Sequence, residues 1–410
     1  MKMKEYKMQQ FAMNEKNPDY QKAIQREKPL YQRRNDLRSD FGRDYTRIIF
    51  SQAYRRLKHK TQVFFAIEDD HVCTRSEHVN LVESVSYTIA QELGLNTELT
   101  KAIAVGHDLG HAPFGHGGET ILTTIAKKHG LDKFWHEKNS LHFVDNIELL
   151  EDNEHFQHNL NLTYAIRDGI ISHCGEMNQK NIQRRTEAID LNDYQHAGQY
   201  NPWTYEGCVV KMSDKIAYLA RDIEDALRLH ILTQNQVDEL KNQLNSIGHY
   251  QFHAINNGSI VNYFIHDVIE NSSVEKGISL SDEAFLKMKV IMEFNYKNIY
   301  LIKRVQIHNK YVSLILESIF DFLYDYSYEN DILEALERDK NQYPKLISHY
   351  IKWLEKYANI PNHPRKEEYK NHIVYDFIND SYAVQRSILD YLAGMSDLFI
   401  VQAFNELISF

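Results

Sequence analysis

The scarcity of helix breakers is the feature that most limits how this chain can fold. Its 410 residues include only 16 glycines and 7 prolines. These two residues are the least favourable in helix interiors, so long stretches without them favour helices. We therefore predict an all-α fold. The one exception that we expect is a small β-hairpin near residues 62–74, where two β-prone runs flank Asp69 and Asp70.

Capping signals and apolar periodicity locate several helices. The pattern Thr74-x-x-Glu77 fits a capping box and predicts a helix that begins just after Thr74 and stops at Gly94. The segment 106–119 is rich in glycine and histidine and contains Pro113, so we expect a loop or a broken helix there. Apolar stripes predict further helices over residues 44–58, 99–108, 209–232 and 383–407.

Composition excludes several classes of protein. The three cysteines are scattered and form no CxxC pair, which argues against a disulfide framework. The polar start of the chain does not resemble a signal peptide, and no apolar run reaches the roughly 18 residues of a membrane span. We expect a cytoplasmic protein with no membrane contact. A formal net charge of -10 argues against a generally basic nucleic-acid binder, although arginines are concentrated in residues 26–56.

One histidine–aspartate pair carries the first chemical signal. His107 and Asp108 place an imidazole beside a carboxylate, the two ligand types that many divalent metals take. His78 lies on the preceding predicted helix. Asp214 interrupts an apolar helical stripe and therefore needs a buried partner. Together the four side chains would hold one divalent ion and leave positions open for water and a phosphate oxygen.

A second group of polar residues follows the pair. It comprises His111, His116, Glu119 and His136. Phosphate-ester hydrolysis needs a proton donor for the leaving oxygen, and the spacing of three between His116 and Glu119 lets the carboxylate orient the imidazole. No P-loop motif occurs, so the phosphates need side-chain cations and hydrogen-bond donors. The residues that we expect to supply them are Arg75, Lys215 and Tyr218, with Asp222 placed to accept from a sugar hydroxyl.

These segments together resemble a known enzyme family. HDLGHAPFGHGGE is similar to the central motif of the deoxyguanosine-triphosphate triphosphohydrolases, a family within the HD superfamily. The likeness extends from about Arg38 to Phe404 through KTQVF, TRSEHVNLVE, RDGIISHCGE, DKIAYLARDIEDAL and LDYLAGMSDLFIVQAF. It implies a mostly helical HD fold and hydrolysis of a dNTP to a deoxynucleoside and inorganic triphosphate.

The resemblance also implies roles for individual residues. The family's metal ligands match His78, His107, Asp108 and Asp214, and its catalytic pair matches His116 and Glu119. In the similar animal dNTP triphosphohydrolase, the histidine that matches His136 acts near the leaving group. The positions that match Gln62 and Asp222 contact the sugar there, and those that match Arg75, Lys215 and Tyr218 contact the phosphates. The proton donor is then either His136 or His116.

Domain organisation, partners and alternatives complete the prediction. We divide the chain into a flexible basic segment (1–37), an HD phosphohydrolase core (38–240) and a helical C-terminal region packed on it (241–410). The family likeness implies a homo-oligomer regulated by a dNTP activator; single-stranded DNA stays open as a partner, and the metal is Mn, Mg, Fe, Co or Ni. The alternatives are an HD hydrolase of a nucleoside monophosphate, a cyclic dinucleotide or an alarmone, and a nucleotide- or single-stranded-DNA-binding regulator.

Overall fold

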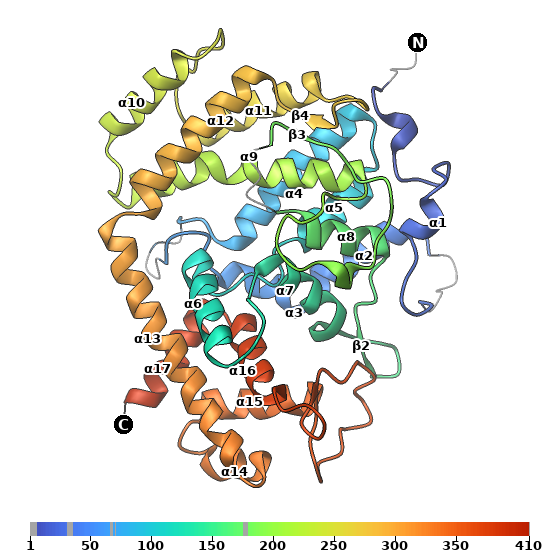
Figure 1. Ribbon diagram of the computed structural model, residues 1–410, viewed down its shortest axis with the longest axis vertical. Helices are drawn as coiled ribbons and strands as arrows, with labels where there is room; N and C mark the ends of the chain where they lie inside the picture. The colour runs from blue at the N-terminus through green and yellow to red at the C-terminus, as the bar shows by residue number, and fades with distance from the viewer. Residues whose placement is uncertain (1–5, 31–35, 66–68, 70, 175–178, 410) are drawn as a thin grey trace.

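The regular secondary structure of the chain is almost all helical, as the sequence predicts (Figure 1). The computed structural model describes residues 6–30, 36–65, 69, 71–174 and 179–409. Within them, β structure is limited to three two-stranded pairs and a few isolated bridges. The pairs are β1 (Leu149–Glu151) with β2 (Gln157–Asn159), β3 (Asn181–Ile182) with β4 (Ile278–Ser279), and β5 (Ala358–Asn359) with β6 (Tyr375–Asp376). No helix among the described residues is long and apolar enough to cross a membrane.

Four helices form the frame around the histidine–aspartate pair: α4 (Arg75–Leu93), α5 (Thr97–Gly106), α8 (Tyr164–Ser172) and α9 (Tyr205–Arg228). The predicted start and stop of α4 are confirmed. Glu77 accepts the Thr74 backbone N–H at 2.7 Å, and Gly94 ends the helix in the left-handed conformation at φ 80°. Helix α9 packs against α4, α5 and α8, so polar residues on its inner face meet the ends of the other three helices.

The glycine-rich segment after α5 is a loop followed by a new helix, as expected. Phe114 has a left-handed backbone (φ 58°) and precedes α6 (Gly115–Lys128). The loop passes very close to α7 (His136–His142), because a Cβ on Gly110 would lie 2.3 Å from the backbone carbon of Asn139. Only glycine allows that approach.

Two predicted helices are each divided by a serine, so the continuous helices expected at 44–58 and 383–407 were wrong. Ser51 separates α2 (Asp40–Phe50) from α3 (Gln52–Arg56), and its hydroxyl caps α3 by accepting from the Tyr54 N–H. Ser396 likewise precedes α17 (Asp397–Ile408) and follows α16 (Ala383–Gly394). Serine at an N-cap satisfies a free N–H of the new helix, which stabilises the break.

The hairpin expected near residues 62–74 is reduced to one isolated antiparallel bridge between Thr61 and Thr74. The described part of this range contains no strand, and residues 66–68 and 70 lie outside the described residues. The two arms still meet, since the Arg75 N–H donates to the Lys60 carbonyl at 2.9 Å. On the other side of the bridge, the Gln62 N–H donates to the Cys73 carbonyl at 3.4 Å.

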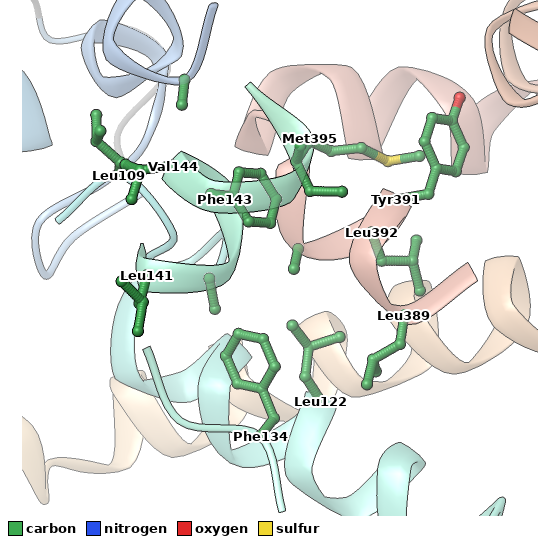
Figure 2. Packing of buried hydrophobic residues seen from close by; sticks show 14 of the residues in the cluster. Leu109, Leu122, Phe134, Leu141, Phe143, Val144, Leu389, Tyr391, Leu392 and Met395 are labelled. Atoms are coloured by element: carbon green, nitrogen blue, oxygen red, sulfur yellow. The ribbon is translucent and has the colours of Figure 1, made fainter. Parts of the chain in front are cut away.

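The remaining helices complete two buried apolar clusters. They are α10 (Gln234–Asn245), α11 (Asn257–Asn271), α12 (Asp282–Asn295), α13 (Lys303–Asp325), α14 (Ile332–Asp339) and α15 (Pro344–Tyr357). Figure 2 shows Leu389 and Leu392 of α16 packed with Leu122 and Phe143, so the last helices share one core with the segment that follows the histidine–aspartate pair.

The predicted N-terminal segment also contacts other parts of the chain. In the described part of the N-terminal segment, residues 6–30, Met8 and Ala23 are fully buried. The Met8 N–H donates to the Leu93 carbonyl at 3.0 Å. The division into 1–37, 38–240 and 241–410 stays a prediction.

Candidate functional site

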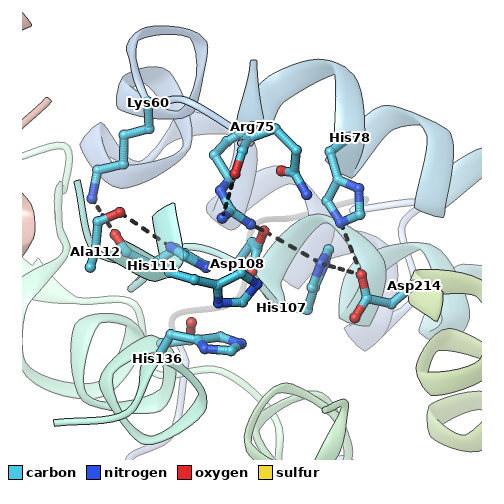
Figure 3. Close-up of polar contacts among 12 residues, drawn as sticks. Lys60, Arg75, His78, His107, Asp108, His111, Ala112, His136 and Asp214 are labelled. Atoms are coloured by element: carbon cyan, nitrogen blue, oxygen red, sulfur yellow. Dashed lines mark hydrogen bonds and ion pairs between the residues drawn. The ribbon is translucent and has the colours of Figure 1, made fainter. Parts of the chain in front are cut away.

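The start of α4, the end of α5 and the inner face of α9 bring the four predicted metal ligands close together (Figure 3). His78 lies in the first turn of α4, His107 follows α5, and Asp214 faces them from α9. The Nε2 of His78 is 2.9 Å from an Asp214 carboxylate oxygen, and the Nε2 of His107 is 3.8 Å from carboxylate oxygens of both Asp108 and Asp214. Since metal–ligand bonds are about 2.0–2.2 Å, atoms spaced in this way can share one ion.

The hydrogen bonds of His107 prepare its ring for such an ion. Its Nδ1 lies 2.6 Å from the Ala104 carbonyl, which can only accept, so the proton is on Nδ1. The Nε2 is therefore the ring nitrogen left to face the carboxylates and to bind an ion. It is fully buried and has no hydrogen-bond partner among the described residues. A buried polar atom without a partner costs free energy unless something binds it, and a divalent cation between two carboxylates fits this atom well.

His173 is a further donor that the sequence reasoning missed. It follows α8 as His107 follows α5, and its Nδ1 lies 2.6 Å from the Ile170 carbonyl. Its ring centroid is 4.8 Å from that of His107, and its buried Nε2 also lacks a partner. Burial and the neighbouring His107 lower the pKa of His173 to about 4, so the ring is neutral. A usable signal was the shared position of both histidines, directly after an apolar helix.

Arg75 is a buried cation in direct contact with the ligand cluster. Its Nη1 lies 2.8 Å from Asp108 Oδ2, and both side chains are almost fully buried. Its other nitrogens donate to the carbonyls of Thr61 at 3.1 Å and Gln62 at 3.3 Å. Burial alone would raise the pKa of Asp108, but Arg75 and then His107 hold it well below its ordinary value. Asp108 is therefore an ionised carboxylate, the form that binds a metal.

The second predicted group lies next to the first and centres on Glu119. A Glu119 oxygen is 3.1 Å from His136 Nδ1 and 3.6 Å from His116 Nδ1. The other oxygen accepts the His136 backbone N–H at 3.1 Å. The His116 side chain is 77% exposed and that of His136 only 9%, so the better-ordered partner of Glu119 is His136. His111 stacks on His136 with ring centroids 4.7 Å apart.

The charges of this group differ from ring to ring. Burial opposes the charged form of His136, but Glu137 and Glu119 raise its pKa well above the ordinary value. His136 and neighbouring histidines in turn lower the pKa of Glu119 against the effect of burial. Burial, followed by Arg75, lowers the pKa of His111 well below its usual range. The arrangement is a protonated imidazole held by a carboxylate beside a neutral one, which suits proton donation.

The predicted sugar-contacting residues are both buried, each with an oxygen that has no partner among the described residues. These atoms are Oε1 of Gln62 and Oδ1 of Asp222. The Tyr300 hydroxyl donates to the other oxygen of Asp222. Burial raises the pKa of Asp222 to about 6. Tyr300 ends a π-helical turn (Tyr296–Tyr300), and no sequence motif pointed to its contact with Asp222. Lys215 and Tyr218 lie half-buried on α9, one and four positions beyond Asp214.

Comparison with known proteins gives a consistent result. The family model for the HD domain matches residues 75–230. A deoxyguanosinetriphosphate triphosphohydrolase-like protein of Caldanaerobacter subterraneus is 30% identical over 372 residues, which cover 91% of this chain and 86% of that protein. Proteins described in the same words are 38% identical over 291 residues in Desulfatibacillum aliphaticivorans (70% and 74% covered) and 30% identical over 383 residues in Clostridium tetani (92% and 88% covered).

Proposed function

We propose that this chain, which belongs to the deoxyguanosinetriphosphate triphosphohydrolase-like family, hydrolyses deoxynucleoside triphosphates to deoxynucleosides and inorganic triphosphate. The observation that carries the proposal is the buried Nε2 of His107, which has no hydrogen-bond partner among the described residues and lies 3.8 Å from carboxylate oxygens of Asp108 and Asp214. Beside it lies the His136–Glu119 pair with a proton to give. Metal ligands next to a proton donor are what phosphate-ester hydrolysis requires.

His78, His107, Asp108 and Asp214 would hold one divalent ion, with His173 as an additional or replacement nitrogen. Among the described residues these donors form two groups that share His107, one with His78 and Asp214 and the other with Asp108 and His173. When bound, such an ion lowers the pKa of water and neutralises charge on phosphate oxygens. The mixed nitrogen and oxygen set is compatible with Mn, Mg, Fe, Co or Ni. The two carboxylates would remain ionised when the ion is absent, because Asp108 and Asp214 both have lowered pKa values despite their burial.

The chain's own residues account for binding and for proton transfer. Arg75, Lys215 and Tyr218 would bind the triphosphate and stabilise its negative charge as water attacks the α-phosphorus. The bond from this phosphorus to the 5′ oxygen then breaks, and His136 gives its proton to that oxygen. Glu137 and Glu119 favour the protonated form of His136 until that step. We choose His136 over His116 as the donor because it is buried and has two hydrogen-bonding contacts with Glu119.

Sugar selection would fall to Gln62 and Asp222. Each has a buried oxygen without a partner, which can accept a hydroxyl proton from deoxyribose. An analogue that lacks the 3′ hydroxyl would leave these atoms unsatisfied, and such mismatches lower kcat/KM strongly. Tyr300 fixes the orientation of Asp222 through its hydrogen bond.

The test is a product analysis with purified protein, Mn²⁺ and each of the four dNTPs, resolved by anion-exchange chromatography. We expect deoxynucleoside and intact triphosphate from the wild type and none from Asp108→Ala. Asp321→Ala, on an exposed surface carboxylate, is the matched control and should leave turnover unchanged. Release of pyrophosphate or monophosphate would assign the chain to another HD hydrolase. Absence of turnover, also with paired dNTPs as activators, would favour a binding regulator.

Metal identity and assembly are tested on the same protein. Equilibrium dialysis against Mn, Mg, Fe, Co and Ni ions should give about one ion per chain, as expected for a single four-ligand set. The stoichiometry should fall in Asp214→Asn. Light scattering with and without a dNTP tests the proposed homo-oligomer and its activation. A mass equal to one chain under both conditions would refute that part of the proposal.

A further inference from the structure

Asp397 is a buried carboxylate that neither the ligand cluster nor the proton-donor group explains. It is the first residue of α17 and is 1% exposed. One of its oxygens accepts the Phe114 N–H at 2.9 Å. The other accepts the Thr61 N–H at 2.8 Å and the Thr61 hydroxyl. A single side chain near the C-terminus thus holds two loops that are distant from it in sequence.

The contact with Thr61 leads to the ligand cluster. The Thr61 carbonyl accepts from Arg75 Nε at 3.1 Å, and Arg75 Nη1 lies 2.8 Å from Asp108. The orientation of the guanidinium therefore depends on the position of the Thr61 backbone, which Asp397 fixes through both the N–H and the hydroxyl. The contacts therefore lead from Asp397 through Thr61 and Arg75 to Asp108.

The contact with Phe114 leads to the proton-donor group. Phe114 has a left-handed backbone and directly precedes α6, whose first two turns carry His116 and Glu119. A non-glycine residue at positive φ is strained and persists only where surrounding contacts impose it. The hydrogen bond from its N–H to Asp397 is such a contact, so Asp397 helps to set where α6 begins.

Lys60 makes a parallel connection between the same parts of the chain. Its buried Nζ donates to the His111 carbonyl at 2.6 Å and to the Ala393 carbonyl of α16 at 2.8 Å. Figure 3 shows the lysine reaching the loop beside the His111 ring. The C-terminal helices α16 and α17 therefore contact the site loop at two separate points.

We propose that Asp397 is a positioning residue, which sets Arg75 and the start of α6 relative to one another. It does not touch the proposed substrate or metal. All three groups that contact its carboxylate donate hydrogen bonds, and an ionised carboxylate only accepts them. The proposal rests on the proposed function for its kinetic consequence, but its structural consequence can be measured separately.

The first variant is Asp397→Asn, which keeps the shape but turns an amide NH₂ toward donors. Displacement of reacting groups by about 1 Å lowers turnover about a hundredfold, so we expect kcat to fall between about tenfold and a hundredfold. The number of bound Mn²⁺ ions should not change, because His78, His107 and Asp214 are held by other contacts. Glu406→Gln is the matched control, because Glu406 lies on the same helix as Asp397. It accepts the backbone N–H groups of Lys345 and Leu346 at the start of α15.

A second pair keeps the test valid if Asp397→Asn does not fold. Thr61→Val removes the hydroxyl donor to Asp397 and should lower kcat. Thr61→Ser retains the donor and should have a kcat close to that of the wild type. If the contact served stability alone, Thr61→Val and Thr61→Ser variants with equal unfolding temperatures would have equal kcat. Wild-type kcat in both Asp397→Asn and Thr61→Val, or an equal loss in Glu406→Gln, would overturn the proposal.

Amide hydrogen exchange separates this proposal from the proposed function. Peptides that contain Thr61 and Phe114 should exchange at least about tenfold faster in Asp397→Asn than in the wild type or Glu406→Gln, since a hydrogen bond that protects each amide is weakened. If the wild type hydrolyses no dNTP, the proposed function fails while this measurement still decides the positioning role. Unchanged exchange at both peptides would refute it.

Discussion

Replacing Arg75 with glutamine should reveal how strongly the ligand cluster depends on one cation. The Arg75 and Asp108 side chains are 4% and 3% exposed, with 2.8 Å between Nη1 and Oδ2. At an effective dielectric constant of about 20, this separation corresponds to about 6 kcal/mol of gross attraction. Removing one partner of a buried pair costs about 3–5 kcal/mol, because the other charge stays buried. We expect Arg75→Gln to lower the free energy of unfolding of the metal-free protein by about 3–5 kcal/mol.

Bound metal should recover part of the loss, since a cation on Asp108 would neutralise the charge that Arg75 leaves unpaired. The assay is urea unfolding followed by tryptophan fluorescence, in EDTA and in Mn²⁺. In EDTA, the double variant Arg75→Gln/Asp108→Asn should lose about 2–3 kcal/mol less than the sum of the single variants. Additive losses would refute the coupling, and an equal cost of Arg75→Gln with and without Mn²⁺ would place the ion away from Asp108.

Three further outcomes follow from the site. Turnover should decline at alkaline pH as His136 loses its proton, and Glu119→Gln should move that limb to lower pH because the carboxylate raises the His136 pKa; an unmoved limb in a pH–kcat profile would exclude this pair. The raised pKa of Asp222, about 6, means that its ionised form is disfavoured in the folded protein, so its contribution to stability decreases as pH rises from about 4 to about 6. Asp222→Asn should remove that slope from the unfolding free energy, and a slope that persists would assign it to other groups. Gly110→Ala should destabilise by about 3 kcal/mol in thermal unfolding, since its Cβ would lie 2.3 Å from the Asn139 backbone; a variant as stable as the wild type would show that the loop can shift.

The all-α fold and the HD assignment were predictable because their signals are local. The Thr74 capping box, the Gly94 stop and the motif around His107 each lie within one short segment. The breaks at Ser51 and Ser396 were missed because the apolar stripes continue across them, and periodicity alone does not register a cap. Helix α10 was missed for the opposite reason, because it is mostly polar and its apolar face is short.

The candidate site was predictable to the extent that its residues lie in recognisable motifs. His78 and Asp214 come from separate helices but keep the helical spacing of neighbouring apolar residues, which allowed their placement toward the same interior. His173, Tyr300 and Asp397 act through contacts made only in the folded chain. Their positions depend on tertiary packing rather than on local pattern.

The bonds from His107 and His173 to backbone carbonyls have a consequence for metal exchange. Both rings have their orientation fixed by the polypeptide itself, so capture of an ion requires little loss of side-chain freedom. Folding of the apoprotein should then not require the ion, although a bound ion adds to the stability of the folded state. Chelation would yield a folded, inactive protein, and simple addition of the ion would reconstitute it without refolding.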